Sequence, residues 1–273
     1  MRWLFVAVVC GVVALVLFAG EAKLAFLPKE GDKQVWQTKA TIEYESEVGG
    51  QKRKVKEVLT ADAEISCVKD GETLTYTLKP VKFSYIKEDN GKRLEVSSDK
   101  EPPEDNWVLS MLKGRLETGL QGIEASTTHL AVGGAFDGKG FAITVASIVL
   151  PNKPVKEGES WEGQTEFGLP GLMLPLKLTW EYKLVKLNND VAQIEGKVKS
   201  AETTMKMGNC QLKVDAKLVA RIEVKTWHIK DVKTQMSWDF SYEQKETEKM
   251  SGKGKWVEEV KGCLLYTSPS PRD

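Results

Sequence analysis

Apolar and polar residues alternate one by one along most of this chain, which is the spacing of β-strands with one buried face. The longest example is 210–224, where Cys, Leu, Val, Ala, Leu, Ala, Ile and Val take every second position. The same alternation runs over 36–44, 59–67, 174–184 and 236–242. We therefore predict a protein built mainly of β-strands.

Short turn sequences join these runs. Val48–Gln51 contains Gly-Gly, Asp89–Gly91 contains Asn-Gly, and Asn188–Asp190 is Asn-Asn-Asp. Two-residue connections of this kind belong to antiparallel hairpins, because parallel strands need much longer crossovers. At Pro80 the apolar positions change from even to odd, with Val81, Phe83 and Tyr85 following it, which indicates a bulge or bend in a strand near a sheet edge.

One stretch has helical spacing instead. Asn106 can cap a helix near 106–118, and Gly119 can close it; its apolar residues are Trp107, Val108, Met111, Leu112 and Leu116. A single short helix covers only part of a broad sheet whose apolar face must be buried, so the sheet must curl on itself. The prediction is a long antiparallel meander curled into a half-barrel or barrel-like sheet, with one short helix packed on it.

The stretch Leu150–Gly163, LPNKPVKEGESWEG, divides the chain. Its prolines hold the backbone extended, and Gly158 permits a turn before Trp161. It lacks the G-x-S-x-G spacing of a nucleophile elbow. We interpret 151–163 as a structural joint between two strand-rich halves, 23–150 and 164–262.

The joint also resembles a known pattern. Leu-Pro-x-Lys-Pro-Val-x-x-Gly-Glu-Ser-Trp is similar to the central signature of uncharacterised, secreted, β-rich bacterial proteins of planctomycete type. The resemblance implies a fold and not an activity. A helix on a long curled sheet is also similar, in shape alone, to lipoprotein- and lipid-carrier folds of the bacterial envelope.

Both ends of the chain carry distinctive sequences. Arg2 and the apolar run Trp3–Ala19 predict a signal peptide over 1–22, cut after Ala22, and therefore a periplasmic or extracellular protein. The alternative is an uncleaved anchor, which would be its one membrane contact. Residues 263–273, CLLYTSPSPRD, resemble a translated sequencing adapter, so we expect the chain's own sequence to run only to about Gly262.

Charge and cysteine content narrow the partners. The 39 basic and 39 acidic residues balance, and a nucleic-acid partner would need a basic face, so none is expected. Outside the two ends, the cysteines are Cys67 and Cys210. In an exported protein they could form one disulfide; the alternative is two buried free thiols.

Patterns of catalytic chemistry are missing from the sequence. His129 and His228 are far apart and lack metal-ligand spacing, and Glu258-Glu259 lies among lysines, which is typical of a solvated face. No catalytic residue, metal site or cofactor is predicted, and we expect a non-enzymatic protein.

A curled sheet with an apolar face can hold an apolar ligand in its hollow. On this hypothesis the protein is an exported envelope protein that binds a lipid or another apolar small molecule. The residues predicted to line the site are Trp36, Tyr44, Leu178, Trp180, Tyr182, Trp238 and Phe240. The alternative is a structural or interaction module of the envelope with a filled core. An outer-membrane barrel is less favoured, because the turns are short at both ends of the strands and Thr, Ala and Ser dilute the apolar face. An enzyme is less favoured to a similar degree.

Overall fold

The computed structural model describes residues 21–24, 31, 33–70, 73–118, 120–124, 129–132, 146–169, 174–188, 190–203, 209–224, 228–243 and 249–263. The elements at the start and middle of the chain are β1 (Glu21–Ala22), β2 (Lys33–Val48), β3 (Gln51–Asp70), β4 (Thr73–Asp89), β5 (Lys92–Ser97), α2 (Trp107–Thr118), β6 (Leu120–Glu124), β7 (His129–Val132) and β8 (Ala146–Val149). They are followed by β9 (Val155–Lys156), β10 (Ser160–Leu169), β11 (Leu174–Asn188), β12 (Val191–Thr203), β13 (Asn209–Glu223), β14 (Ile229–Glu243) and β15 (Lys249–Cys263). Within this part of the chain, no helix is long and apolar enough to cross a membrane.

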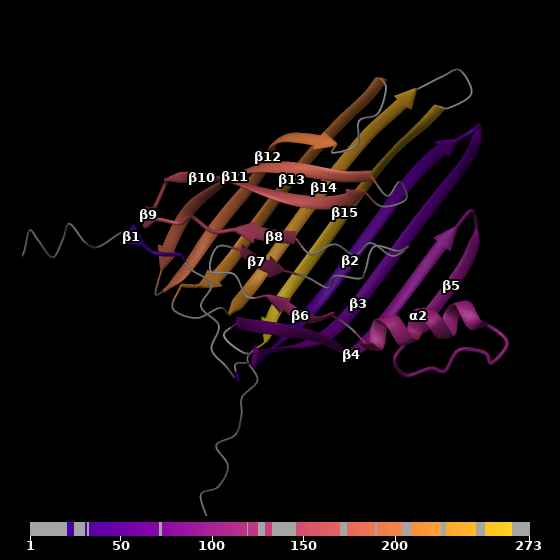
Figure 1. Ribbon diagram of the computed structural model, residues 1–273, viewed down its shortest axis with the longest axis horizontal. Coiled ribbons are helices and arrows are strands. Elements are labelled where there is room, and N and C mark those ends of the chain that lie inside the picture. The colour runs from indigo at the N-terminus through magenta and orange to yellow at the C-terminus, as the bar shows by residue number, and fades with distance from the viewer. Residues whose placement is uncertain are drawn as a thin grey trace, which may run out of the picture.

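One large antiparallel sheet dominates the structure (Figure 1). Its strands lie in the order β10-β11-β12-β13-β14-β15-β2-β3-β4-β5, and β6 pairs with the free part of β4. The sheet has two ends, β10 and β5, and is not closed into a barrel. The predicted fold class, a mainly β protein with a curled antiparallel sheet and one short helix, is confirmed.

The last strand pairs with the first long strand. β15 lies beside β2 from Met250↔Val48 to Cys263↔Val35. This last strand, β15, begins at Lys249 and reaches Cys263. The two strand-rich halves are therefore parts of one continuous sheet.

The predicted turns are tight hairpins. Gly49 and Gly50 have φ of 57° and 78°, and Asn90 and Gly91 have φ of 48° and 80°. Two successive positive φ values define the type I′ turn, whose twist suits antiparallel strands and which favours Gly and Asn. The end of the sheet that carries Gly49–Gly50, at the upper right of Figure 1, is called the hairpin end below.

The change of parity at Pro80 is a β-bulge. Ala63 pairs with Pro80, but Asp62 pairs with Lys82, so Val81 is the extra residue. Val81 is 62% exposed, although the sequence grouped it with the buried residues that follow. The bulge lies where β4 changes partner, since β5 pairs only from Ser84 onward.

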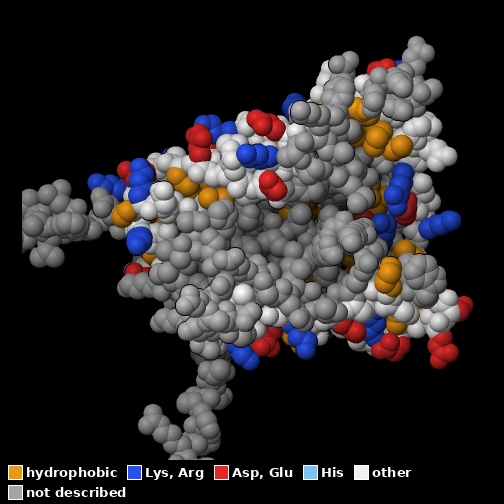
Figure 2. Space-filling model, in the orientation of Figure 1, with side chains coloured by type: hydrophobic (Ala, Val, Ile, Leu, Met, Phe, Trp, Pro, Cys, Tyr) orange, Lys and Arg blue, Asp and Glu red, His pale blue; other side chains and the backbone are white. Residues whose placement is uncertain are grey.

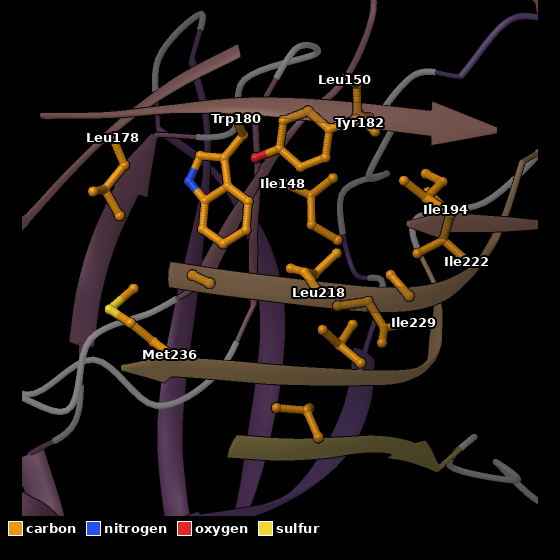
Figure 3. Packing of buried hydrophobic residues seen from close by; sticks show 14 of the residues in the cluster. Ile148, Leu150, Leu178, Trp180, Tyr182, Ile194, Leu218, Ile222, Ile229 and Met236 are labelled. Carbon is orange, nitrogen blue, oxygen red and sulfur yellow. The ribbon is translucent and has the colours of Figure 1, made fainter. Parts of the chain in front are cut away.

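The face that carries the apolar residues, called the inner face, holds the core. The β7–β8 hairpin lies over this face in front of the long strands (Figure 1). Ile148 of β8 is fully buried and lies among Trp180, Tyr182 and Leu218 (Figure 3). Further along the same face, α2 packs on β4 and β5, where Leu109 joins a second apolar cluster.

The predicted helix is confirmed. The Asn106 side chain accepts a hydrogen bond from the Leu109 backbone N–H at 3.2 Å, which caps the helix as expected. Among the helix side chains that the structure describes, Leu109 and Lys113 are buried, whereas Met111, predicted to be on the apolar face, is 38% exposed. The Lys113 ammonium group donates a hydrogen bond to the Lys100 carbonyl at 3.2 Å, so the preceding loop supplies a partner for this buried charge.

Glycines on the inner face of β15 make room for aromatic rings on β14. A Cβ on Gly254 would lie 2.3 Å from Trp238, and one on Gly252 would lie 2.7 Å from Phe240. Both distances are far below van der Waals contact. The two rings therefore occupy space over β15 that a side chain at either glycine would fill.

The joint forms β9 and the turn into β10. β9 pairs with β1, where Ala22 faces Val155. Gly158 has φ of 88° and its N–H donates to the Leu184 carbonyl at 2.7 Å. Trp161 donates from its indole to the Val149 carbonyl at 2.7 Å. Residues 1–20 of the predicted signal peptide and 264–273 of the predicted adapter tail lie outside the described residues.

The two cysteines are not joined by a disulfide in the structure. Cys67 is buried, and Cys210 is half-buried. Cys210 lies in the same row of paired residues as Gln51, and Cys67 is sixteen residues further along β3. At about 3.3 Å per residue the thiols are roughly 50 Å apart, whereas a disulfide needs Cα atoms within about 7 Å.

Candidate functional site

All seven residues predicted to line a ligand site lie on the inner face and are buried. Their exposed fractions run from 0% at Tyr182 to 6% at Tyr44. Trp36, Tyr44, Leu178, Trp180, Tyr182 and Trp238 belong to the main core cluster, whereas Phe240 belongs to a small separate cluster at the hairpin end. The sequence therefore placed these side chains on the correct face, but it could not divide them into two clusters.

The aromatic residues of the main cluster pack against one another. The Tyr182 ring stacks on Trp161 at 5.7 Å and on Trp180 at 5.9 Å between ring centroids. The Trp180 indole donates to the Thr165 hydroxyl at 3.0 Å. Burial raises the pKa of Tyr182 well above its usual range, so it stays neutral. Such mutual packing is typical of a filled core.

A buried polar cluster interrupts the inner face between β3 and β4. The Glu57 carboxylate accepts a hydrogen bond from Lys87 Nζ at 2.9 Å and another from the Tyr85 hydroxyl at 3.0 Å. Glu57 and Lys87 are both below one-tenth exposed. A buried ion pair offsets its desolvation only when hydrogen bonds satisfy it, as they do here. The buried charges of Glu57 and Lys87 are thus neutralised within the cluster, which suits a structural role.

A second polar pair lies one row nearer the hairpin end. Arg53 donates through Nε to both carboxylate oxygens of Asp89 at 3.0 Å. This contact with Arg53 lowers the pKa of Asp89. The neighbouring Tyr44 has a pKa raised to about 12, chiefly by burial and then by the Glu57 charge. The inner face near the hairpin end is thus apolar on β13–β14 and polar on β3–β4.

Glu258 corrects an expectation from the sequence. Glu259 is paired with Lys233 at 2.7 Å, as a solvated face requires, but Glu258 points the other way and is 2% exposed. Neither of its carboxylate oxygens has a hydrogen-bond partner, nor has the hydroxyl of Thr234, which faces it on β14. Burial without a compensating charge raises the pKa of Glu258 well above its usual range.

Strand parity could have revealed these residues. Glu57 lies between Val55 and Leu59 at the apolar spacing, and Glu258 lies in the same way between Trp256 and Val260. A charged residue at an apolar position of a strand is a signal of burial. What parity could not supply is the partner, because Lys87 is thirty residues from Glu57 along the chain.

The outer face of the sheet is charged and hollowed by the sheet's twist. A groove of about 1160 Å³ crosses β15, β2, β3 and β4, and cross-strand ion pairs line it. Glu43 contacts Lys56 and Lys255 at 3.0 Å each, and these hydrogen bonds lower its pKa. Figure 2 views the molecule from the side of the β7–β8 hairpin, where lysine, arginine and carboxylate side chains are also interspersed. Because acidic and basic side chains are paired along it, the groove has no electrostatic potential of a single sign.

The sheet separates between β12 and β13 towards the hairpin end. The two strands pair only from Val191↔Glu223 to Lys197↔Lys217. A bulge between Thr179 and Trp180 leaves Lys199 as an extra residue in β12, and beyond it β12 follows β11 alone. The inward side chains on the unpaired part of β13, namely Cys210, Leu212 and Val214, are only half-buried.

We find no metal-binding arrangement in the part of the chain described above. There, no group of three His, Cys, Asp or Glu side chains could hold a metal ion. His228 contacts Glu223 at 3.4 Å, at the turn between β13 and β14. His129 lies on β7, and its side chain is outside the described residues.

In comparisons with known proteins, part of the chain matches a family whose function is unknown. Residues 142–247, which include β8 to β14, match the model of a family described as "Family of unknown function (DUF6263)". This supports the expectation of an uncharacterised family; the bacterial group and the joint motif stay predictions. No curated protein matches the chain. OpdQ of Pseudomonas aeruginosa has a TM-score of 0.26 and 8% identity over 85% of this chain and 100% of its own; so low a score carries no argument.

Proposed function

We propose that this protein is a non-enzymatic, exported envelope protein that acts as an interaction module with a filled core. The burial of the inner-face aromatic residues carries the proposal. Trp180, Tyr182 and Trp238 are at most 4% exposed, and the first two stack on each other. A carrier would need these rings to border space for its ligand, and here they contact one another and the β7–β8 hairpin instead.

A second candidate, binding of an apolar ligand, is supported by the hairpin end alone. There Phe240 and Tyr242 form a small cluster with the half-buried Cys210, Leu212 and Met250. An acyl chain laid on this patch would cover apolar surface that the fold leaves exposed. The ligand site is then much smaller than the sequence predicted, since the six other residues belong to the core.

Native mass spectrometry of the protein produced in a bacterial periplasm separates the two candidates. The interaction module predicts the bare mass of the chain together with cooperative unfolding. A co-purifying adduct of lipid size, lost when Leu212 is changed to Glu, would contradict the module and favour the carrier. Val219→Glu is the matched control, because Val219 is an exposed apolar residue on the outer face of the same strand.

A further inference from the structure

The unpaired edge of β13 is the feature that points to a partner. From Asn209 to Ala216 this strand pairs with β14 on one side, whereas its pairing with β12 begins only at Lys217. Eight residues of strand, about 25 Å, therefore present backbone N–H and C=O groups that no described strand bonds. Proteins usually cover or shorten such edges, because they pair readily with another chain.

Beyond Lys197↔Lys217 the two strands follow different partners. Val198–Thr203 of β12 lie along β11, and Asn209–Ala216 of β13 pair with β14. Among the described residues, the second edge of β13 over Asn209–Ala216 therefore has no strand beside it.

We propose that the β13 edge binds an extended peptide segment of a partner protein as an added antiparallel strand along Asn209–Ala216. The proposal rests on the proposed function as an interaction module and names the partner's chemistry. A peptide can bond the open backbone groups, which an acyl chain cannot do.

The side chains along the edge specify the peptide. Cys210, Leu212 and Val214 face inward beside Phe240 and Tyr242, so apolar residues at alternate positions of the peptide extend this patch. On the outer face Lys213 and Asp215 are exposed. An antiparallel peptide should therefore place an acidic residue opposite Lys213 and, two positions earlier, a basic residue opposite Asp215.

The test uses two end-capped peptides and the full chain. The first, Val-Lys-Val-Glu-Val-Thr-Ile, puts its lysine opposite Asp215 and its glutamate opposite Lys213; the second exchanges that lysine and glutamate. Calorimetry measures affinity, and hydrogen exchange reports the amides of 209–216. We expect the first peptide to bind about tenfold more tightly, because two cross-strand charge pairs change from opposite to like charges.

A charge-exchanged protein is the decisive control. In the double variant Lys213→Glu with Asp215→Lys both positions are exposed, so the fold should persist, and the preference between the peptides should reverse. Slower exchange at 209–216 with both protein forms would support the proposal. Equal binding of both peptides, or protection at another strand such as β5, would overturn it. A failure of both peptides to bind would also overturn it, while a bare native mass would still leave the interaction module in place.

Discussion

At the residue scale, the inner face depends on a few positions that break the apolar pattern. Gly252 and Gly254 replace side chains with space that the Phe240 and Trp238 rings fill. Glu57 is charged but satisfied by Lys87 and Tyr85, whereas Glu258 is buried without a hydrogen-bond partner. Parity alone places all of these residues inward, but it does not distinguish a satisfied carboxylate from an unsatisfied one.

The raised pKa of Glu258 predicts a stability that falls as the pH rises. Its folded pKa lies above its unfolded value near 4.5, so the folded state keeps the proton while the unfolded state loses it. The contribution of Glu258 to stability is therefore complete below about pH 4.5 and is lost as the pH rises towards the folded pKa. The slope is at most about 1.4 kcal/mol per pH unit.

Urea unfolding between pH 5 and 8 checks this expectation. Glu258→Gln should remove the slope and be more stable than the unmodified protein at pH 8, with the gap closing towards pH 5. Glu259→Gln is the matched control, because that carboxylate is exposed and paired with Lys233, which lowers its pKa. Parallel stability curves for the Glu258→Gln variant and the unmodified protein would refute the buried, proton-linked role.

At the element scale, local signals are strong wherever one residue determines the backbone. Gly49–Gly50 and Asn90–Gly91 form the hairpins that their sequences predict, and Asn106 caps α2. The burial of Leu109 and Lys113 in α2 was not predicted, because it depends on which strands the helix meets. Lys113 can be buried there because its ammonium group donates hydrogen bonds to the Lys100 carbonyl and the Glu101 carboxylate of the preceding loop.

Removal of the α2 cap should weaken the helix and not the sheet. Asn106→Ala deletes the acceptor for the Leu109 N–H, and caps of this kind contribute about 1 kcal/mol to the free energy of unfolding. Ser110→Ala is the control, because Ser110 is exposed and its hydroxyl adds only a 3.3 Å bond to the Asn106 carbonyl. Chemical denaturation measures both, and equal losses would argue against the cap.

At the scale of the whole molecule, the order of the strands is the main result that the sequence did not contain. β15 and β2, at opposite ends of the described chain, form the centre of the sheet. This arrangement separates Cys67 from Cys210 and makes the two halves one structure. The divergence of β12 from β13 is likewise a property of the sheet, because a bulge in one strand redirects its neighbours.

A pair of engineered cysteines tests the central pairing. Glu45 and Lys253 face each other across β2 and β15 on the exposed outer face, so Glu45→Cys with Lys253→Cys should form a disulfide under mild oxidation. Lys39→Cys with Lys253→Cys is the control; position 39 is six residues away along β2, about 20 Å, and should stay reduced. Peptide mass mapping identifies the bond. Cross-linking of the control pair, or none in the first, would refute the strand order.

The sequence by itself determined the antiparallel strands, their faces, their tight turns and the helix, because each depends on residues a few positions apart. Only the tertiary structure decided which strands are neighbours, that the aromatic residues fill a core, and that an edge of β13 stays open. The physical reason is that a two-residue period states which side of a strand is buried but contains no information about which strand lies beside it. That choice depends on packing between residues that are distant in sequence, such as Met250 and Val48.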